Sequence, residues 1–538
     1  MMLSYLKAFI LSLRQANMTK WFQVLFTCFL VYFAIRLFIY HYYLVIFPYP
    51  NTCREGALMA TTTMLLHGVN PYNFLLEPQY TNIYGIVYPL IVLPLASLFG
   101  VNLVVHRVTS AFFILASCLI IFFVLYKKKT PLLLIFWAML TLYACLLFPL
   151  TSTPCVDPAS TGLFFMLLTI FIPFLFDYSN RSLVVSIVCG VLAFYTKPYF
   201  FLGIPVMVSY LFLFISKRKS IFFGGWFLLC FALSVVAMNH FFPSYFDDCF
   251  FIHNNYASHY SITNVLQRQL YQFADLHKGI FFLVLLVSVY SLGRWLMAGK
   301  IKVIKKFLKD FLASIRWKNW EDPLISSRLP LDVYAGICSA TVLLCFMGKH
   351  YGANLWYFFQ LFSPFLVIFI AWLTGQFILW PIVLSSLLIY NLFSLTSDDH
   401  YKYFDKKTEG WQTIEMLIKS HGRILHSPLI APLLIKENRE IFDSGSTEYF
   451  FWGGQRKGLW RCLFKEDNRV YMAQAAYFNK IQNRVENKEF DLVIIAAGDS
   501  SPGIPDSIRS FYTYVSSIFV YVPQDRRPYL ITIWQPNK

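Results

Sequence analysis

Long apolar runs, separated by short polar connections, fill the first 395 residues of the chain. A helix that crosses a membrane needs about 20 mainly apolar residues, and eleven runs reach or approach that length. They are 22–47, 103–126, 131–150, 158–176, 183–197, 199–215, 221–242, 279–297, 331–348, 354–373 and 376–395. This pattern predicts an α-helical polytopic membrane protein with about eleven transmembrane helices.

One further apolar run, 84–99, admits two interpretations. If it crossed the membrane, the cluster Lys127–Lys129 and every later loop would change sides. If it lies at the interface as a juxtamembrane helix, that cluster shares a side with Lys217–Lys219 and the basic loop 298–330. Because cytoplasmic loops carry the excess of Lys and Arg, the second interpretation is favoured. It predicts a cytoplasmic N-terminus and a C-terminal domain on the opposite side.

The periodicity changes after residue 395, where the long apolar runs end. A helical pattern covers 411–420, and strand-like patterns cover 423–426, 490–497, 512–522 and 529–534. We therefore predict two domains: a transmembrane catalytic domain, 1–395, with a first external loop at 48–102, and a small α/β domain, 396–538. The sequence contains neither GxGxxG nor GxxxxGK[ST], so a nucleotide-binding fold is not indicated.

Composition agrees with membrane insertion. Hydrophobic residues make up 57% of the chain, charged residues 14%, and the mean hydropathy is +0.55. The net charge of +17 would be compatible with nucleic-acid binding. Many basic residues, however, lie in short loops beside the predicted spans, which is the pattern that sets membrane topology. We therefore expect membrane lipids as partners and no nucleic acid.

Ionisable residues near the predicted external ends of the spans are the candidates for chemistry, because charge at bilayer level is costly and usually functional. Glu55 is the first of these, a few residues beyond the first span, at the start of a helical stretch that ends at Gly68 and Tyr72. The other candidates share this side of the membrane: Arg54, Asp157, Lys197, Lys349, His350, Asn354 and Tyr357.

Several of these positions together resemble the GT-C type membrane glycosyltransferases, which include protein mannosyltransferases and the lipid A aminoarabinose transferase. The resemblance covers most of the membrane part and rests on the order of short motifs relative to the spans. In this sequence they are Glu55 through Gly68 and Tyr72; Tyr88-Pro89-Leu90; Phe99-Gly100 followed by Arg107; Val156-Asp157-Pro158; Thr196-Lys197; and Gly348-Lys349 followed by Tyr357 and Pro364.

The resemblance implies an inverting transferase that moves a sugar from a polyprenyl-phosphate donor to a glycan, lipid or protein acceptor on the non-cytoplasmic face. Inversion requires a carboxylate to take the acceptor's proton and cations to hold the leaving phosphate. Glu55 is then the expected base and Asp157 a supporting catalytic acid. The expected phosphate ligands are Arg54, Lys197, Lys349 and His350, and the expected substrate contacts are Tyr88, Asn354 and Tyr357.

The sequence departs from the family at one position. Many relatives have an Asp immediately before the Glu of the first loop, and that Asp is the presumed base; here Arg54 precedes Glu55. Either Glu55 has taken over this role or the base lies elsewhere. No metal site is indicated, and the absence of an Asp-x-Asp step favours a lipid-linked donor, although a divalent metal requirement stays open.

Each candidate residue also has a structural interpretation. Glu55 could be an interfacial acid paired with Arg54, Asp157 a helix N-cap before Pro158, and Lys197 a lysine that reaches the interface from a span end. Lys349 and His350 could be interfacial residues. At the level of the whole protein, the alternatives are a transporter or lipid flippase and an inactive scaffold of the same fold. A bacterial inner membrane is the expected location, because endoplasmic-reticulum retention signals and conspicuous glycosylation sites are lacking.

Overall fold

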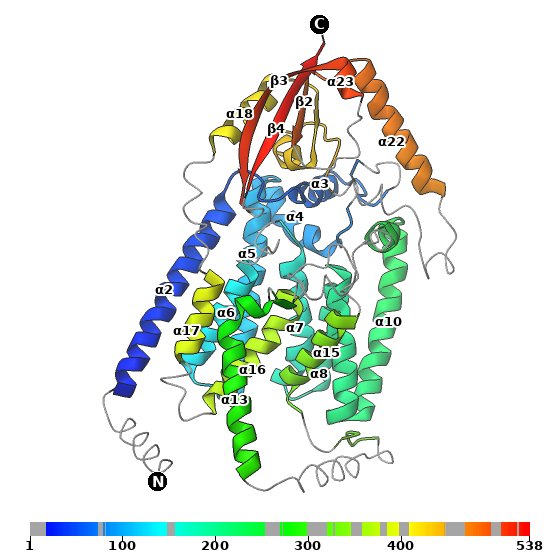
Figure 1. The fold of residues 1–538 in the computed structure, drawn as a ribbon. Coiled ribbons are helices and arrows are strands. Elements are labelled where there is room, and N and C mark those ends of the chain that lie inside the picture. Colours follow the sequence, from blue (N-terminus) through cyan, green and yellow to red (C-terminus); the bar gives the residue numbers. More distant parts are fainter. Residues whose placement is uncertain are drawn as a thin grey trace.

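The structure of the protein is a computed structural model, and it is mostly helical (Figure 1). It describes residues 18–73, 79–80, 82–147, 156–252, 270–271, 273–297, 320–325, 329–345, 358–376, 385–396, 408–445, 447, 468–496, 507–523 and 527–537.

Helices occupy the ranges predicted to span the membrane. Those formed by a single helix are α2 (Met18–Ile46), α5 (Leu103–Lys127), α6 (Leu132–Leu147), α7 (Ala159–Leu175), α8 (Asn180–Phe194), α10 (Lys217–Phe241), α13 (Lys278–Met297), α15 (Leu331–Cys345) and α17 (Ser385–Thr396). Two are composite: η2 (Pro198–Leu202), α9 (Gly203–Tyr210) and η3 (Leu211–Ile215) follow one another, as do η6 (Phe358–Phe362) and α16 (Ser363–Gly375). The polytopic helical architecture predicted from the apolar runs is therefore present.

Four of the described helical segments are long and apolar enough to cross a membrane by length and composition: Trp21–Ile46, Leu103–Lys127, Pro198–Ile215 and Lys217–Phe241. The other apolar helices at these ranges are shorter in the part that the structure describes. The chain is thus an integral membrane protein, and eleven crossings remain the number predicted from the sequence.

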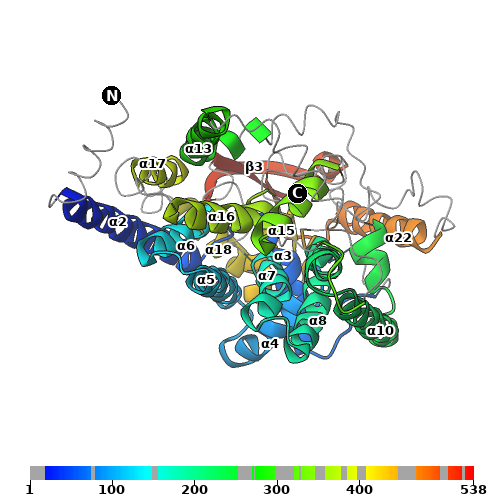
Figure 2. The same ribbon diagram turned by 90° about the horizontal axis from the view of Figure 1, so that it is seen from below.

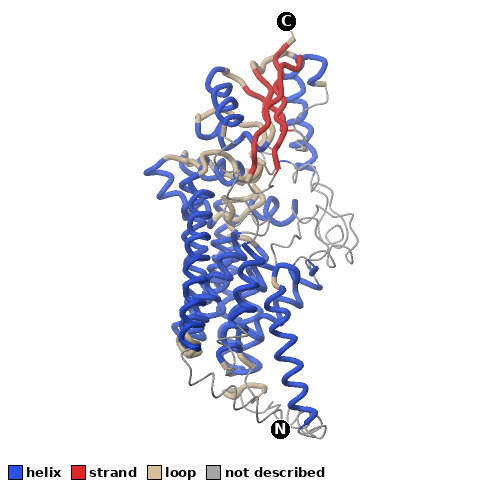
Figure 3. The backbone as a smooth tube through the Cα atoms, turned by 60° about the vertical axis from the view of Figure 1, so that its left-hand side comes forward, coloured by secondary structure: helices blue, strands red, loops and turns tan. Residues whose placement is uncertain are grey.

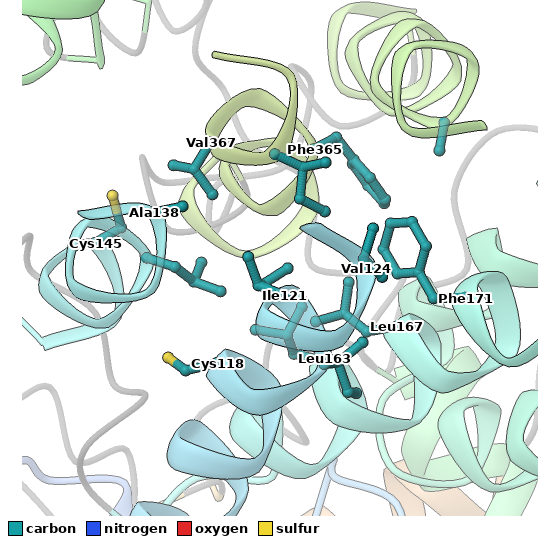
Figure 4. Packing of buried hydrophobic residues seen from close by; sticks show 14 of the residues in the cluster. Cys118, Ile121, Val124, Ala138, Cys145, Leu163, Leu167, Phe171, Phe365 and Val367 are labelled. Atoms are coloured by element: carbon teal, nitrogen blue, oxygen red, sulfur yellow. The ribbon is translucent and has the colours of Figure 1, made fainter. Parts of the chain in front are cut away.

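Apolar side chains from α5, α6, α7 and α16 interlock in the centre of the bundle (Figure 4). Ile121 and Val124 of α5 are fully or almost fully buried, and the rings of Phe171 in α7 and Phe365 in α16 have centroids 6.0 Å apart. Cys118 and Cys145 belong to the same cluster, where a cysteine acts as a small apolar residue. These contacts fix the helices that carry the candidate site.

Basic loops predicted to share the cytoplasmic side do meet at one end of the bundle. Lys127 lies 2.7 Å from Asp177, Lys128 lies 2.7 Å from Asp332, and Arg218 pairs with Glu321. The Lys128–Asp332 pair is almost fully buried, so it ties the end of α5 to the start of α15. The loops that the charge pattern groups together are therefore neighbours in space, while the compartment that they face stays a prediction.

Two short helices lie at the opposite end of the bundle, beside the C-terminal sheet (Figure 1). They are α3 (Glu55–Leu66) and α4 (Val87–Phe99). Helix α4 is the structured part of the ambiguous run 84–99, and its 13 residues are too few to cross a bilayer. It leaves Leu98 and Phe99 exposed, 75% and 69% respectively, as expected for a helix at the membrane interface. Its length thus agrees with the juxtamembrane interpretation.

The C-terminal region contains a four-stranded sheet in the order β1-β2-β4-β3 (Figure 3). Strand β1 (Ile424–His426) pairs in parallel with β2 (Leu492–Ala496), whereas β4 (Arg527–Pro536) is antiparallel to both β2 and β3 (Tyr512–Val522). The accompanying helical segments are α18 (Glu409–Ser420), η9 (Pro428–Ile430), α19 (Ala431–Lys436), α22 (Asn468–Glu486) and α23 (Ile508–Phe511). The four strands and the helix at 411–420 predicted from the sequence are confirmed.

One hydrophobic core joins the first external loop to this sheet. Tyr49, Leu58 and Tyr88 belong to the same buried cluster as Trp411 of α18 and Ile531 of β4. Viewed from below, the strands lie behind the bundle helices, at the end that carries α3 (Figure 2). The residues after 395 therefore rest directly on the segment that carries Arg54 and Glu55.

Candidate active site

Glu55 forms a fully buried ion pair with Arg107 near the start of α5. The Arg107 Nε donates to Glu55 Oε1 at 2.9 Å, and Nη2 donates to Oε2 at 2.7 Å. Two backbone amides complete the carboxylate's hydrogen bonds: Asn51 N donates to Oε2 at 2.7 Å, and Val156 N donates to Oε1 at 3.0 Å. Each carboxylate oxygen thus accepts two hydrogen bonds, and neither is exposed to solvent.

Arg107 uses its remaining donors to hold the chain that leads from α2 to α3. Its Nη2 donates to the Tyr49 carbonyl at 2.8 Å, and its Nη1 donates to the carbonyls of Leu44 and Phe47. A planar guanidinium can reach several acceptors in this way, which a lysine ammonium cannot reproduce. The ion pair therefore holds the turn between α2 and α3 in place.

The surroundings of Glu55 bear on its expected role as the general base, which remains a prediction. A general base needs an oxygen within reach of the substrate's proton. Both oxygens of Glu55 are occupied and buried, and their charge is balanced by Arg107 rather than by Arg54. These contacts suit a structural role, in which Glu55 holds the turn between α2 and α3 and, through Val156, the residue before Asp157.

Asp157 and Lys197 form the second ion pair of the site. Lys197 Nζ lies 2.7 Å from Asp157 Oδ1, which also accepts a hydrogen bond from Ala159 N at 2.6 Å. The bond to Ala159 joins Asp157 to the first residue of α7, but the N-cap of this helix is Pro158, so Asp157 is not the N-cap that its structural interpretation expected. The side chains are 4% and 13% exposed, which makes this pair more accessible than Glu55 and Arg107.

Arg54 places a further positive charge near this pair. Burial is the main cause that lowers the pKa of the Lys197 ammonium; the attraction of Asp157 opposes this effect, and the positive charge of Arg54 adds to it. The sequence predicts that Arg54, Asp157 and Lys197 lie near one another, and the effects of Arg54 and Asp157 on the pKa of Lys197 are consistent with this prediction. The cations named in this region are Arg54, Lys197 and Arg107, and its named carboxylates are Glu55 and Asp157.

Aromatic rings surround the Lys197 ammonium. Its Nζ lies 4.9 Å from the centroid of the Tyr84 ring and 5.9 Å from that of Tyr199. Such contacts stabilise a cation that has lost part of its water. Two hydrogen bonds hold the backbone of Tyr84: its carbonyl accepts one from Tyr72 Oη at 2.7 Å and one from Cys249 Sγ at 3.2 Å. The ammonium is therefore confined before any substrate arrives.

Gly85 allows the Tyr84 loop to lie against the end of α8. Its amide donates to the Thr196 carbonyl at 3.1 Å, and a Cβ at this position would lie 1.9 Å from the Tyr195 carbonyl oxygen. We expect Gly85→Ala to displace the loop and to lower the free energy of unfolding by about 1–3 kcal/mol. Thermal unfolding of the purified protein measures this change. The matched control is Gly225→Ala in α10, where an added Cβ meets nothing within 4 Å, and equal melting temperatures would contradict the prediction.

Tyr88 does not contact the candidate site in the way expected from the sequence. It is fully buried, and its hydroxyl donates to the His106 carbonyl at 2.7 Å and lies 3.0 Å from Ser110 Oγ. Its hydroxyl thus joins α4 to α5, and a contact of Tyr88 with substrate remains a prediction. Lys349, His350, Asn354 and Tyr357 fall outside the residues that the structure describes, so their roles remain predictions.

The sequence motifs included Arg107 but did not identify it as the partner of Glu55, and they did not include Tyr84 and Tyr199 near Lys197. Arg107 carried a usable signal, because an arginine near the start of an otherwise apolar span needs a buried acid as its partner. The two tyrosines carried no such signal, because nothing in the sequence distinguishes them from the other tyrosines among the chain's 34. Within the described ranges, no group of three His, Cys, Asp or Glu residues could hold a metal ion.

An apolar cavity of about 580 Å³ lies close to this region. Its walls come from α3, α4, the start of α5 and α19, and they include Met59, Phe99, Val105 and Leu433. Lys436 and Asn102 are the polar residues of its lining. The volume is typical of small-molecule sites, and the lining suits a hydrocarbon chain.

Comparison with known proteins finds no family model and no curated protein that matches, and two solved structures of low similarity. ArnT from Cupriavidus metallidurans bound to undecaprenyl phosphate is 12% identical with a TM-score of 0.47, over 94% of this chain and 98% of that chain. Apo ArnT has the same identity and coverage with a TM-score of 0.41.

Proposed function

We propose that the protein is an inverting membrane glycosyltransferase that transfers a sugar from a polyprenyl-phosphate donor to an acceptor on the non-cytoplasmic face. The observation that carries the proposal is the pair of linked ion pairs at one end of the bundle. Glu55 binds Arg107 and the amide of Val156, and the next residue, Asp157, binds Lys197. Ionisable residues gathered at one end of a membrane bundle mark a functional site by default.

Lys197 is the proposed ligand of the donor phosphate, with Arg54 beside it. The leaving phosphate gains negative charge as its bond to the anomeric carbon breaks, and a confined cation stabilises that charge. When the phosphate engages Lys197, the ammonium is shared between phosphate and Asp157. A carboxylate that loses part of its cation accepts a proton more readily. Binding of the donor would thereby prepare Asp157 for its role.

Asp157 is the proposed proton acceptor. The acceptor hydroxyl oxygen attacks the anomeric carbon from the face opposite the phosphate, and a new C–O bond forms with inversion. The bond between the anomeric carbon and the phosphate oxygen breaks, and polyprenyl phosphate leaves with its electron pair. The hydroxyl proton passes to the Asp157 carboxylate, so that charge and atoms balance.

Reconstitution in lipid nanodiscs tests the function. The purified protein is supplied with a panel of radiolabelled polyprenyl-phosphate sugars and with glycan, lipid and peptide acceptors, and product is separated from donor. We expect one donor to yield a glycoside with inverted anomeric configuration. Movement of the donor across vesicles without any transfer would refute the proposal and support the transporter alternative.

The charge of Lys197 predicts how donor binding depends on pH. An ammonium binds phosphate only while it is protonated, and the pKa of Lys197 is lowered from the ordinary 10.5 by burial and by Arg54. We therefore expect binding of undecaprenyl phosphate to weaken with rising pH, starting below the pH at which an ordinary lysine would lose its proton. In Lys197→Arg, binding should persist to higher pH, because a guanidinium stays charged.

Titration of the protein with fluorescent undecaprenyl phosphate from pH 6 to 10.5 measures this effect. Lys197→Met should weaken binding by about 1.5–3 kcal/mol, the range of a charge-assisted hydrogen bond, which is about ten- to a hundredfold in Kd. Lys128→Met, which removes a similarly buried lysine at the opposite end, is the matched control. Identical titration curves for the wild type and Lys197→Arg would exclude Lys197 as the phosphate ligand.

A further inference from the structure

The C-terminal domain touches the turn that carries Arg54 and Glu55 at both of its ends. At the first end, the Trp411 ring of α18 is stacked on the Tyr49 ring, with centroids 5.6 Å apart and planes inclined by 8°. At the second end, the loop that contains Ser444 and Gly445 lies against Cys53 and Gly56. The segment 49–56 is therefore held between the bundle on one side and the C-terminal domain on the other.

Two glycines make the second contact possible. Gly445 has a φ of +104°, which favours glycine, and a Cβ there would lie 2.3 Å from the Cys53 carbonyl oxygen. Gly56 is in the first turn of α3, where an alanine would otherwise favour the helix. A Cβ at Gly56 would lie 2.7 Å from the Ser444 carbonyl oxygen and 2.8 Å from the Ala431 Cβ. Both backbones therefore approach more closely than any side chain would permit.

The same turn provides the partners of the buried ion pair. The Tyr49 carbonyl accepts from Arg107 Nη2 at 2.8 Å, and Asn51 N donates to Glu55 Oε2 at 2.7 Å. Glu55 in turn accepts from Val156 N, which precedes Asp157. A continuous chain of contacts thus runs from Trp411 and Gly445 through Tyr49 and Glu55 to Asp157.

We propose that the C-terminal domain is a positioning element of the active site: through Trp411 and the Ser444–Gly445 loop it clamps the turn 49–56 and so holds Glu55, Arg107 and the residue before Asp157 in place. The role of Asp157 in transfer rests on the function proposed above, whereas the clamp itself is independent of it. Trp411, Gly445 and Gly56 are positioning residues, because they act through the ion pair and touch no reacting atom.

Hydrogen exchange followed by mass spectrometry tests the clamp on the full-length protein in detergent. The variants are Gly445→Ala and Gly56→Ala, and the matched control is Gly225→Ala, whose added Cβ meets nothing. The clamp predicts about tenfold faster exchange of the Asn51 and Val156 amides in both variants, because local opening frees the amides that Glu55 holds. Peptides from α7 and α8 should exchange as in the wild type. Faster exchange confined to the C-terminal domain would overturn the proposal.

Trp411 provides a second pair of variants that keeps the test decisive if a glycine variant does not fold. Trp411→Phe retains a ring for stacking on Tyr49 but loses the hydrogen bond from Nε1 to the Tyr521 carbonyl at 2.9 Å. Trp411→Leu loses both. The clamp predicts near wild-type exchange at Asn51 and Val156 in Trp411→Phe and fast exchange in Trp411→Leu. Equal exchange in the two variants would contradict a role for the stacked ring.

Binding of undecaprenyl phosphate separates this proposal from the function on which its catalytic role rests. If the Asn51 and Val156 amides respond to Gly445→Ala while the wild type binds no undecaprenyl phosphate, the clamp holds and the proposed function fails. If the wild type binds and transfers but the amides do not respond, the clamp fails and the function holds. With both proposals correct, Gly445→Ala lowers the transfer rate by about tenfold, as misplacement of a catalytic group does, and changes the Kd for undecaprenyl phosphate much less.

Discussion

Replacing Asp157 with asparagine is expected to lower the rate of sugar transfer by about 10²–10⁴-fold, the usual contribution of a general base. Asparagine has nearly the same shape and can still accept the hydrogen bond from Ala159 N, so the start of α7 keeps this contact. It cannot take the acceptor's proton. Lys197 stays in place to bind the phosphate and no longer shares its ammonium with a carboxylate, so the loss should appear in kcat.

The matched control for this substitution is Asp332→Asn. Asp332 is as deeply buried as Asp157 and also pairs with a lysine at 2.7 Å, but it lies at the opposite end of the bundle. Steady-state transfer by the two variants in nanodiscs, at equal protein concentration and equal melting temperature, separates chemistry from packing. Equal transfer rates in Asp157→Asn and Asp332→Asn would remove Asp157 from the mechanism.

Glu55→Gln and Arg107→Gln are each expected to lower the free energy of unfolding by about 3–5 kcal/mol, the cost of leaving one charge of a buried pair unbalanced. The double variant Glu55→Gln/Arg107→Gln removes both charges and leaves two amides that can bond to each other. Its destabilisation should therefore be well below the sum of the two single effects. Thermal unfolding in detergent gives the melting temperature of the wild type and of each of the three variants, and the shifts in melting temperature measure the three losses of stability.

Transfer by the same double variant distinguishes a positioning residue from a base. If Glu55 only fixes the turn 49–56, the double variant recovers part of the transfer that each single variant loses, because the turn regains neutral partners. A base could not be recovered in this way, since glutamine accepts no proton at neutral pH. Two results would support Glu55 as the base: a loss of stability in the double variant equal to the sum of the two single losses, or a double variant as inactive in transfer as Asp157→Asn.

Much of the architecture was predictable because it depends on local patterns. The apolar runs place the helices, and the change of periodicity after residue 395 places the strands β1 to β4 and helix α18. The charge pattern grouped the loops that contain Lys127, Lys128 and Arg218, and their ion pairs lie at one end of the bundle. Helix α4 could not be predicted from hydropathy alone, because the hydropathy of 84–99 fits both a membrane span and an interfacial helix.

The site was predictable in its location but only partly in its roles. An acid beyond the first span, an Asp-Pro step and a Thr-Lys step indicated one external site, and Asp157 and Lys197 do pair there. The structural alternative for Glu55 paired it with its neighbour Arg54, yet Arg107, 52 positions away, is the bonded cation. Nothing in the local sequence records which of two arginines has the geometry to reach a buried carboxylate.

By itself the sequence determined that this chain is a helical membrane protein with an α/β region after the last span and with ionisable residues gathered on one side. These properties follow from hydropathy, length and charge, which act residue by residue. Only the tertiary structure decided that Glu55 is saturated by Arg107 and two amides, that Lys197 faces Asp157, and that the C-terminal domain rests on the turn 49–56. Burial decides these roles, because a carboxylate acts as a base only where a proton can reach it, and burial depends on residues that are distant in the chain.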